Sequence, residues 1–427
     1  MNQAVKLPVD IDVAIIGGGI IGVSTGYALA RAGVRVAVFE KGTLACEQSS
    51  RNWGWVRTLG RDMAEVPLAL RAHELWRELQ RRVDVGFRQT GILYLAENED
   101  DDRKHHDWAE RAQAIGVNVQ LLGRSATLRY LPTTRRPWSS AMFSPTDGVA
   151  EPAIATRGIA KLATADGCQI VENCAVRGIE TSAGRVSGIV TEHGPVKVST
   201  VLMAGGAWSR LFCGNLDIDL PQLKVRASVL RTSPIATPMD VTINGKDFTC
   251  RRRADGGYTV SQFGASYADI VPDSFRLFRH FLPAWLDNHS FVKLRFGKRF
   301  FEEMAVPRRF AADRVTPFER MRVLDPVASP GAVSSAFRRL AGAFPDFENA
   351  RVLQSWGGYI DVTPDAIPVM CAVDSVPGFF LASGFSGHGF GIGPAVGEFM
   401  AKLIQGHHAA EQTRPFELSR FHRRSSS

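Results

Sequence analysis

The sequence predicts a two-domain α/β protein, and three observations lead to that fold class. A glycine-rich strand–turn–helix–strand unit stands near the amino terminus. From about residue 221 to residue 345 the pattern changes to short alternating strands with frequent prolines and arginines, and it contains no second glycine motif of that kind. The carboxyl-terminal region then returns to the first pattern, with apolar strands, a glycine-rich turn and a helix. We therefore expect two interleaved domains.

The opening unit runs from Val13 to Glu40. Four apolar, β-prone residues lead into Gly17-x-Gly19-x-x-Gly22, a helical pattern follows, and a second apolar strand ends on the acid. In a Rossmann-like dinucleotide site the first glycine permits a tight turn, the second lets the backbone approach a pyrophosphate, and the third lets the helix pack closely on the strand. The helix amino terminus faces the phosphates with free N–H groups, and the acid accepts hydrogen bonds from ribose hydroxyls. This motif fits both NAD and FAD.

Residues 11–30 are apolar enough to resemble a signal peptide or a membrane span. However, Asp12 opens the stretch, four glycines lie in its middle, and no basic region precedes it. These features favour a buried strand and helix. No other segment approaches the length of a span, so we expect a soluble, cytoplasmic protein without a stable membrane span.

The chain has 427 residues and a formal net charge of +8. Its basic residues are spread out, with small clusters such as Arg251–Arg253 and Arg308–Arg309, and no nucleic-acid recognition motif accompanies them. This balance favours a general attraction for an anionic cofactor and substrate over nucleic-acid binding. The six cysteines form no C-x-x-C pair. That spacing argues against a structural zinc site or redox dithiol and suits a reducing compartment, so no metal is expected.

The remaining elements follow from periodicity and turn residues. A helix is expected around Leu68–Leu79, and Glu151-Pro152 opens another. Glu99 begins a charged helix whose His105 and His106 are more typical of a solvated face than of a metal site. Strands are expected at residues 90–96, 169–176, 186–191, 196–203, 223–232, 258–262, 351–359 and 378–382, a helical stretch at 275–286, and a final helix through 396–403.

Three separated stretches together carry a resemblance to a known family. They are the opening glycine motif with its acid, Ala204-Gly-Gly-Ala-Trp-Ser209, and Ala382-Ser-Gly-Phe-Ser-Gly-His-Gly-Phe390. The chain resembles the D-amino-acid oxidase superfamily of FAD-dependent amine oxidoreductases, which includes glycine oxidase, monomeric sarcosine oxidase and D-amino-acid dehydrogenase. Pro67–Trp76 and the final glycine-rich stretch are similar to the sarcosine oxidase branch in particular. The resemblance runs from Asp12 to about Ile404 and is weakest between 215 and 345.

The resemblance implies a fold, a cofactor and a site. The fold is a Rossmann-like FAD-binding domain, interrupted and formed by residues 1–85, 145–220 and 346–427, with an inserted mixed β-sheet substrate domain at 86–144 and 221–345. FAD is implied over NAD because NAD-binding Rossmann domains lack the second and third stretches. The implied cofactor-binding residues are Gly17, Gly19, Ile20, Gly22, Glu40, Lys41, Ser49, Ser50, Arg51, Asn52, Val176, Gly205, Trp208, Gly387, His388, Gly389, Gly391 and Ile392. The implied catalytic residues are Arg57, Tyr359 and His388.

The sequence also departs from the family pattern at four places. Gly391 replaces a substrate-binding lysine of sarcosine oxidases, and Gly358 replaces the cysteine that some of these enzymes join to FAD, so non-covalent FAD is expected. Tyr359-Ile-Asp361 stands where other members carry a substrate-binding arginine. The lysine that promotes reaction with oxygen has no clear counterpart near residues 250–257, where Arg252 or Arg253 takes its neighbourhood.

The chemistry that the resemblance implies is oxidation of an amine, most typically an N-substituted or D-amino acid. A hydride passes from the α-carbon to the flavin, and the resulting imine hydrolyses. Oxygen or another electron acceptor then reoxidises the flavin. Two alternatives stay open: a flavoprotein subunit that relays electrons within a larger dehydrogenase complex, and a flavin-binding protein without catalytic activity. A homo-oligomer or a complex subunit is the expected assembly.

An amino-acid substrate needs a cation to bind its carboxylate. Arg57 follows the Ser50–Val56 loop that should run beside the flavin, so it is the first candidate; the alternative is a surface arginine packed on Trp55. Arg51 lies nearer the cofactor and is expected to serve its phosphates or its dimethylbenzene edge.

Overall fold

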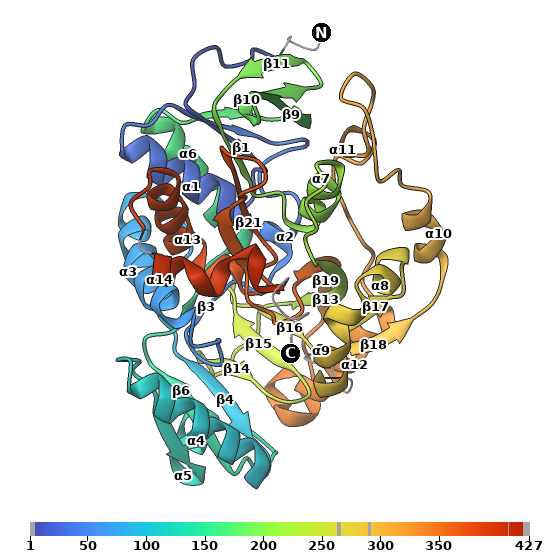
Figure 1. The fold of residues 1–427 in the computed structure, drawn as a ribbon. Coiled ribbons are helices and arrows are strands. Elements are labelled where there is room, and N and C mark those ends of the chain that lie inside the picture. The colour runs from blue at the N-terminus through green and yellow to red at the C-terminus, as the bar shows by residue number, and fades with distance from the viewer. Residues whose placement is uncertain (1–4, 263–265, 289–291, 409, 422–427) are drawn as a thin grey trace.

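The computed structural model describes residues 5–262, 266–288, 292–408 and 410–421. Two large sheets organise the chain (Figure 1). The first sheet has six strands in the order β20 (Val369–Ala372), β21 (Phe379–Ser383), β12 (Thr200–Met203), β1 (Val13–Ile16), β2 (Val36–Phe39) and β8 (Gln169–Val171). All neighbouring pairs are parallel except β20 with β21. The predicted α/β class and Rossmann-like core are confirmed.

Both faces of this sheet are covered, which explains why its strands are apolar throughout. Alternate residues of β1 and β2 point to opposite faces. Val13 and Ile15 pack with four helices on one face: α1 (Ile20–Arg31), α3 (Val66–Arg82), α6 (Pro152–Ala165) and α13 (Gly389–Ile404). Ala14 and Ile16 pack on the other face with the three-stranded sheet of β9 (Val176–Ser182), β10 (Arg185–Thr191) and β11 (Gly194–Lys197).

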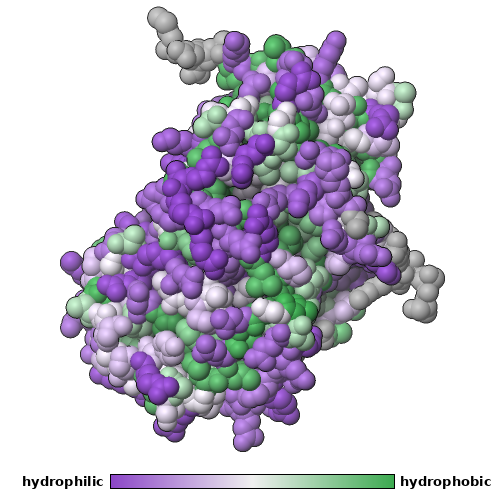
Figure 2. Space-filling view, turned by 90° about the vertical axis from the view of Figure 1, so that its left-hand side faces the viewer, coloured by the Kyte–Doolittle hydropathy of each residue, from purple (hydrophilic) through white to green (hydrophobic). Residues whose placement is uncertain are grey.

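Helix α3 shows why the periodic pattern predicted a helix here. Its buried residues recur every three or four positions and face α13, while charged residues lie between them. Figure 2 shows the side of the molecule on which α3 lies, and its surface is mainly hydrophilic in the upper and middle part. Among the described residues, no helix is both long and apolar enough to cross a membrane.

The second sheet is mixed and has ten strands. Nine follow the order β18 (Val292–Arg295), β17 (Ser266–Asp269), β13 (Leu223–Thr232), β16 (Tyr258–Ser261), β15 (Thr249–Arg252), β14 (Thr242–Asn244), β4 (Ile92–Ala96), β6 (Ser140–Ser144) and β5 (Gln120–Gly123). The tenth, β19 (Val352–Val362), pairs antiparallel with β13 along its whole length. This strand lies within a segment assigned to the FAD-binding domain, yet it belongs to the larger sheet. The residue bounds of the two domains stay a prediction.

Three predicted elements are divided in the structure. The strand expected at 169–176 is two strands, β8 and β9, because Asn173 takes a left-handed conformation (φ 52°) and turns the chain between two sheets. The strand expected at 196–203 is also divided because the chain passes from one sheet to another: β11 belongs to the three-stranded sheet and β12 to the six-stranded sheet. The helical stretch 275–286 consists of α8 (Pro272–Arg276) and α9 (Phe278–Asn288).

Candidate functional site

A cavity of about 450 Å³ lies between the two large sheets. Its lining includes Ile16, Phe39 and Met203 at the carboxyl ends of parallel strands, and Val225 and Val229 of β13. The carboxyl ends of parallel strands are where open α/β sheets bind their ligands. All three predicted catalytic residues line the cavity, and so do all predicted cofactor residues except Gly22, Ser50 and Ile392.

The glycine turn opens directly into this cavity. Gly17 has φ 113°, and a Cβ atom there would lie 2.5 Å from the carbonyl oxygen of Ala204, so a side chain is excluded. A Cβ atom on Gly22 would lie 2.0 Å from the carbonyl oxygen of Gly17. A glycine is therefore required at this position because the helix packs closely on the turn, and not because the residue contacts the cavity. At Gly19 the nearest protein atom to a Cβ would be the hydroxyl of Ser49 at 3.0 Å, so the glycine keeps that side of the turn open.

Ser49 and Glu40 hold this turn from two sides. The Ser49 hydroxyl accepts a hydrogen bond of 2.8 Å from the backbone N–H of Ile20, the first residue of α1. The Glu40 carboxylate accepts hydrogen bonds of 2.8 Å from the backbone N–H groups of Gly18 and Gly42. Burial raises the pKa of Glu40, and these two N–H groups oppose that rise. The predicted contact between Glu40 and a ribose stays a prediction.

Lys41 and Trp208 meet at Glu47 on the cavity wall. The Lys41 ammonium donates to the Glu47 carboxylate at 2.6 Å and to the carbonyl oxygen of Arg322 at 2.8 Å. The indole N–H of Trp208 donates to the other carboxylate oxygen at 2.9 Å, and the ammonium lies 4.4 Å from the indole ring centre. This cluster ties the loop after β2 to residues 321–322. The positive charge of Lys41 is therefore balanced by the carboxylate of Glu47.

The predicted loop at 49–52 contains one short helix, α2 (Gln48–Arg51). Asn52 closes it: the side-chain amide donates to the carbonyl oxygen of Ser49 at 3.0 Å, and the amide oxygen accepts from the N–H of Gly54 at 2.8 Å. Arg51 pairs with Asp325 and bonds the carbonyl oxygen of Cys46 at 3.1 Å. Ser50 bonds the carbonyl oxygen of Glu47 and faces away from the cavity.

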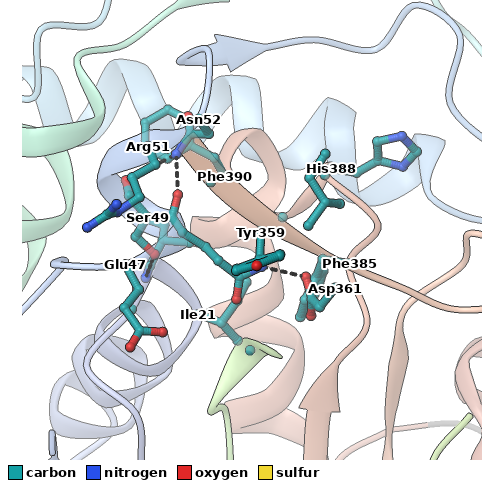
Figure 3. A pocket seen from close by; sticks show the side chains of 18 of the residues that line it. Ile21, Glu47, Ser49, Arg51, Asn52, Tyr359, Asp361, Phe385, His388 and Phe390 are labelled. Carbon is teal, nitrogen blue, oxygen red and sulfur yellow. Dashed lines mark hydrogen bonds between the residues drawn. The ribbon is translucent and has the colours of Figure 1, made fainter. Parts of the chain in front are cut away.

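Side chains from both ends of the chain meet across the cavity. Figure 3 shows Glu47, Ser49 and Arg51 of the amino-terminal loop on one side. Tyr359 and Asp361 of β19, with Phe385 and His388 of the turn before α13, lie on the other side.

A buried charged cluster joins α3 to the start of α13. Arg61 and Glu65 are 1% and 0% exposed, and Nη1 of the arginine lies 3.2 Å from the carboxylate. The other Glu65 oxygen lies 3.1 Å from Nδ1 of His388. Arg61 also donates to the carbonyl oxygens of Arg57 at 2.8 Å and of His388 at 3.0 Å. The cluster therefore connects two predicted catalytic residues through two residues that the sequence reasoning had not singled out.

The protonation states in this cluster follow from burial and charge. Burial lowers the pKa of His388, and Glu65 only partly opposes this, so the imidazole is neutral at pH 7. Burial would raise the pKa of Glu65, but the hydrogen bond from His388 and the charge of Arg61 bring it below the usual value. Burial lowers the pKa of Arg61 to about 10, which leaves it charged. A neutral imidazole beside a carboxylate carries its proton on Nδ1, so Nε2 has the free lone pair.

Arg57 differs from the other cations of the cavity. Lys41, Arg51 and Arg61 each have a carboxylate partner within 4.0 Å. Arg57 bonds the carbonyl oxygen of Leu59, and among the described residues no carboxylate pairs with it. A half-buried guanidinium without a counter-charge on a cavity wall is suited to bind an anionic group.

Two residues of β19 have different surroundings in the cavity wall. Tyr359 packs under the guanidinium of Arg299, 4.8 Å from its ring centre. Asp361 is buried and accepts hydrogen bonds from Gln48 at 2.8 Å and from the N–H of Gly384 at 2.8 Å. Burial raises the pKa of Asp361. The carboxylate thus joins α2 to the turn before α13.

The start of α13 explains one of the departures from the family pattern. A Cβ atom on Gly391 would lie 2.6 Å from the carbonyl oxygen of Trp55, so the backbone of the preceding loop fills the space where a side chain would begin. The indole N–H of Trp76 fixes the Gly391 carbonyl at 2.7 Å. Gly387, with φ 86°, forms the turn, while Ile392 points into the core.

The arginines expected near an oxygen site lie elsewhere. Arg252 pairs with Asp240 at 3.6 Å, and Arg253 bonds the hydroxyl of Thr259 at 3.1 Å. Neither belongs to the described lining of the cavity. A role for either arginine in place of the oxygen-activating lysine stays a prediction.

Comparison with known proteins agrees with the geometry of the site. The model of the DAO family, described as FAD dependent oxidoreductase, matches residues 12–403. The chain belongs to this family. FAD is its cofactor, as the resemblance implied.

Several relatives of this DAO-family protein are named as enzymes that act on amino acids. It is 27% identical to glycine oxidase of Geobacillus kaustophilus, over 96% of this chain and 97% of the relative. It is 27% identical to N-methyl-L-tryptophan oxidase of Citrobacter koseri, over 96% of this chain and 99% of the relative. The structure of L-amino acid deaminase from Proteus myxofaciens in complex with anthranilate is similar with a TM-score of 0.94 and 30% identity, covering 98% of this chain and 96% of that one.

The glycine turn of this DAO-family chain fits the pyrophosphate of FAD. The first turn of α1 has no acidic residue, and Gly19 has no side chain that could cap the helix; the one side chain that bonds its first N–H is the neutral Ser49. A helix amino terminus that opens into a cavity in this way attracts an anion. Gly17, Gly19, Ile20, Glu40 and Val176 all line the cavity. Their contacts with the phosphates and the nucleoside of FAD stay a prediction.

Proposed function

We propose that this protein oxidises an amino acid at its α-carbon and produces an imine that hydrolyses in water. Bound FAD supplies the acceptor for the hydride. The observation that carries the proposal is the position of Arg57, whose unpaired guanidinium faces the same cavity as the FAD-binding turn. The planar guanidinium can bind both oxygens of a substrate carboxylate and so orient the α-carbon.

His388 is the acceptor for the proton that the substrate ammonium group must lose. An amino acid in water carries an ammonium group, and its α-carbon gives up a hydride only after that group is deprotonated. The neutral imidazole of His388 lines the cavity and offers Nε2 as the acceptor, because Nδ1 is engaged by Glu65. Glu65 thus acts as a positioning residue that selects the tautomer.

The substrate class follows from the relatives and from the sequence. The relatives named above act on glycine, an N-methyl amino acid and L-amino acids, which supports an amino-acid substrate. We infer an N-substituted or D-amino acid as the first class to test. L-amino acids are the second class, supported by the deaminase similarity. An anaerobic screen of N-substituted, D- and L-amino acids for bleaching of the flavin spectrum distinguishes these substrates.

A second candidate function is a dehydrogenase subunit that passes electrons to an acceptor other than oxygen. It is supported by the positions of Arg252 and Arg253 outside the described lining of the cavity. We expect reduced enzyme to react with oxygen more slowly than it turns over with a dye or quinone acceptor. Stopped-flow mixing with oxygen measures this, and reoxidation as fast as turnover would identify an oxidase.

The decisive experiment on the substrate site is Arg57→Ala. Loss of a desolvated partner of a carboxylate costs about 2–4 kcal/mol of substrate binding. The matching amine without a carboxylate should bind the variant as it binds the wild type, and Arg57→Lys should recover part of the loss because it restores charge but not the planar fork. Arg252→Ala is the matched control outside the cavity. Equal binding of both substrates by wild type and Arg57→Ala would refute the role of Arg57.

A further inference from the structure

Four phenylalanines form a cluster at the surface, outside the described lining of the cofactor cavity. They come from α8, from the residue after β18, and from α10 (Lys298–Met304). The ring of Phe300 lies 6.4 Å from that of Phe275, 5.2 Å from that of Phe296 and 5.4 Å from that of Phe301. Phe275, Phe296 and Phe301 are 66%, 60% and 56% exposed. We call these four residues the phenylalanine patch.

The patch is held by an element that is itself anchored. One side of α10 carries Arg299 and Glu303. The guanidinium of Arg299 contacts Tyr359 of the cavity wall, and the carboxylate of Glu303 accepts from the ammonium of Lys224 at 2.7 Å. Phe301 and Met304 lie on the opposite side of the helix and are exposed. The helix therefore already uses its polar face for folding, and its apolar face is left toward solvent. An exposed apolar surface of this kind marks a site of interaction.

Basic residues surround the patch. Residues 271–309 contain eight lysines and arginines against four aspartates and glutamates, so this segment carries half of the formal charge of the chain. Lys298 is 88% exposed next to the patch. Arg276 and Arg308 share one acid, Asp273, with the half-buried Arg210. Lys298 pairs with Glu302 at 3.2 Å, so several of these cations have partners, and the segment still keeps a net positive formal charge because its basic residues outnumber its acids.

We propose that the phenylalanine patch docks on the surface of an anionic lipid bilayer. Aromatic side chains that enter the interface, surrounded by basic residues that face lipid phosphates, are the composition of a peripheral membrane site. A second copy of the chain fits less well, because a symmetric contact would bring two positively charged surfaces together. The proposal is independent of the substrate and of the electron acceptor.

Vesicle co-sedimentation of the full-length, FAD-loaded protein tests this. Vesicles of phosphatidylcholine with phosphatidylglycerol should bind the wild type, and vesicles of phosphatidylcholine alone should bind it at least ten-fold more weakly. Phe296→Ser with Phe301→Ser should raise the lipid concentration for half-binding at least ten-fold, and Arg276→Glu with Lys298→Glu should do the same. The matched control is Ile115→Ser with Leu121→Ser, which removes two exposed apolar side chains from a different part of the surface. Each variant is checked for an unchanged flavin spectrum and thermal unfolding.

Three outcomes would overturn the proposal. The first is a wild type that stays in the supernatant at millimolar anionic lipid. The second is a patch variant that binds as the wild type does, or a control variant that loses binding equally. The third is dimerisation without lipid that the phenylalanine variants abolish, together with no lipid binding; the patch would then be a protein–protein interface.

Discussion

Substitution of Glu65 by glutamine removes one charge from the buried cluster and preserves its volume. Arg61 is 1% exposed, so the variant leaves a buried guanidinium without its counter-charge. Removing one partner of a buried ion pair costs about 3–5 kcal/mol. The amide oxygen of glutamine still accepts one hydrogen bond, and Arg61 keeps its bonds to the carbonyl oxygens of Arg57 and His388. Because these bonds remain, we expect a loss of about 2–3 kcal/mol in the free energy of unfolding, somewhat less than the full cost of a broken buried pair.

Urea unfolding of wild type and Glu65→Gln, each with saturating FAD, measures this loss. The matched control is Glu74→Gln in α3, the helix that begins directly after Glu65. The Glu74 carboxylate is 58% exposed and pairs with Arg71. An exposed pair of this kind contributes about 0.5 kcal/mol or less. If the two variants lose the same amount, the buried pair does not stabilise the fold, and the reasoning about Arg61 is refuted.

The same variant has a second readout that a purely structural role would leave unchanged. Burial lowers the pKa of His388, while Glu65 raises it by hydrogen bonding and charge. Loss of Glu65 removes that opposing effect, so the pKa of His388 should fall further. The neutral base then persists to lower pH, and the acid limb of the kcat/KM profile should move to lower pH. An acid limb that stays in place would contradict the assignment of His388 as proton acceptor.

Three other predictions concern the cofactor and the pH dependence of stability. Gly19→Val should fold but purify without flavin, because its side chain would point into the pyrophosphate space with only Ser49 nearby; a fully loaded yellow variant would contradict the placement. Acid precipitation should release FAD into the supernatant, because Gly358 stands at the position of the flavin-linking cysteine, whereas flavin in the pellet would show a covalent bond. Burial lowers the pKa of His73 and of His388, so the unfolded state binds more protons below about pH 6.5, and stability should fall as pH falls through that range. Urea unfolding at pH 7.5 and 5.5 measures this, and greater stability at pH 5.5 would be the contrary result.

The sequence alone was sufficient to predict the strand–turn–helix core of the six-stranded sheet, because the interactions that determine it are local. The apolar run before Gly17 and the spacing to Gly22 require a strand, a tight turn and a closely packed helix, because other residues would collide with the backbone there. The apolar spacing of α3 likewise determines which face of that helix is buried. The resemblance to the FAD-dependent family rested on three such local stretches, and it is confirmed.

Only the tertiary structure decided which charges are paired in the site. Arg51, Arg57 and Arg61 look alike in the sequence, and the fold separates them by giving Asp325 to the first and Glu65 to the third. Arg61 and Glu65 are four residues apart in the segment before α3, and this short separation was a signal that local reasoning could have used. The contact of Glu65 with His388 spans 323 residues and had no such signal. Local sequence patterns determine sterics and burial, whereas the protonation and charge of a site depend on groups that only the packing of distant segments brings together.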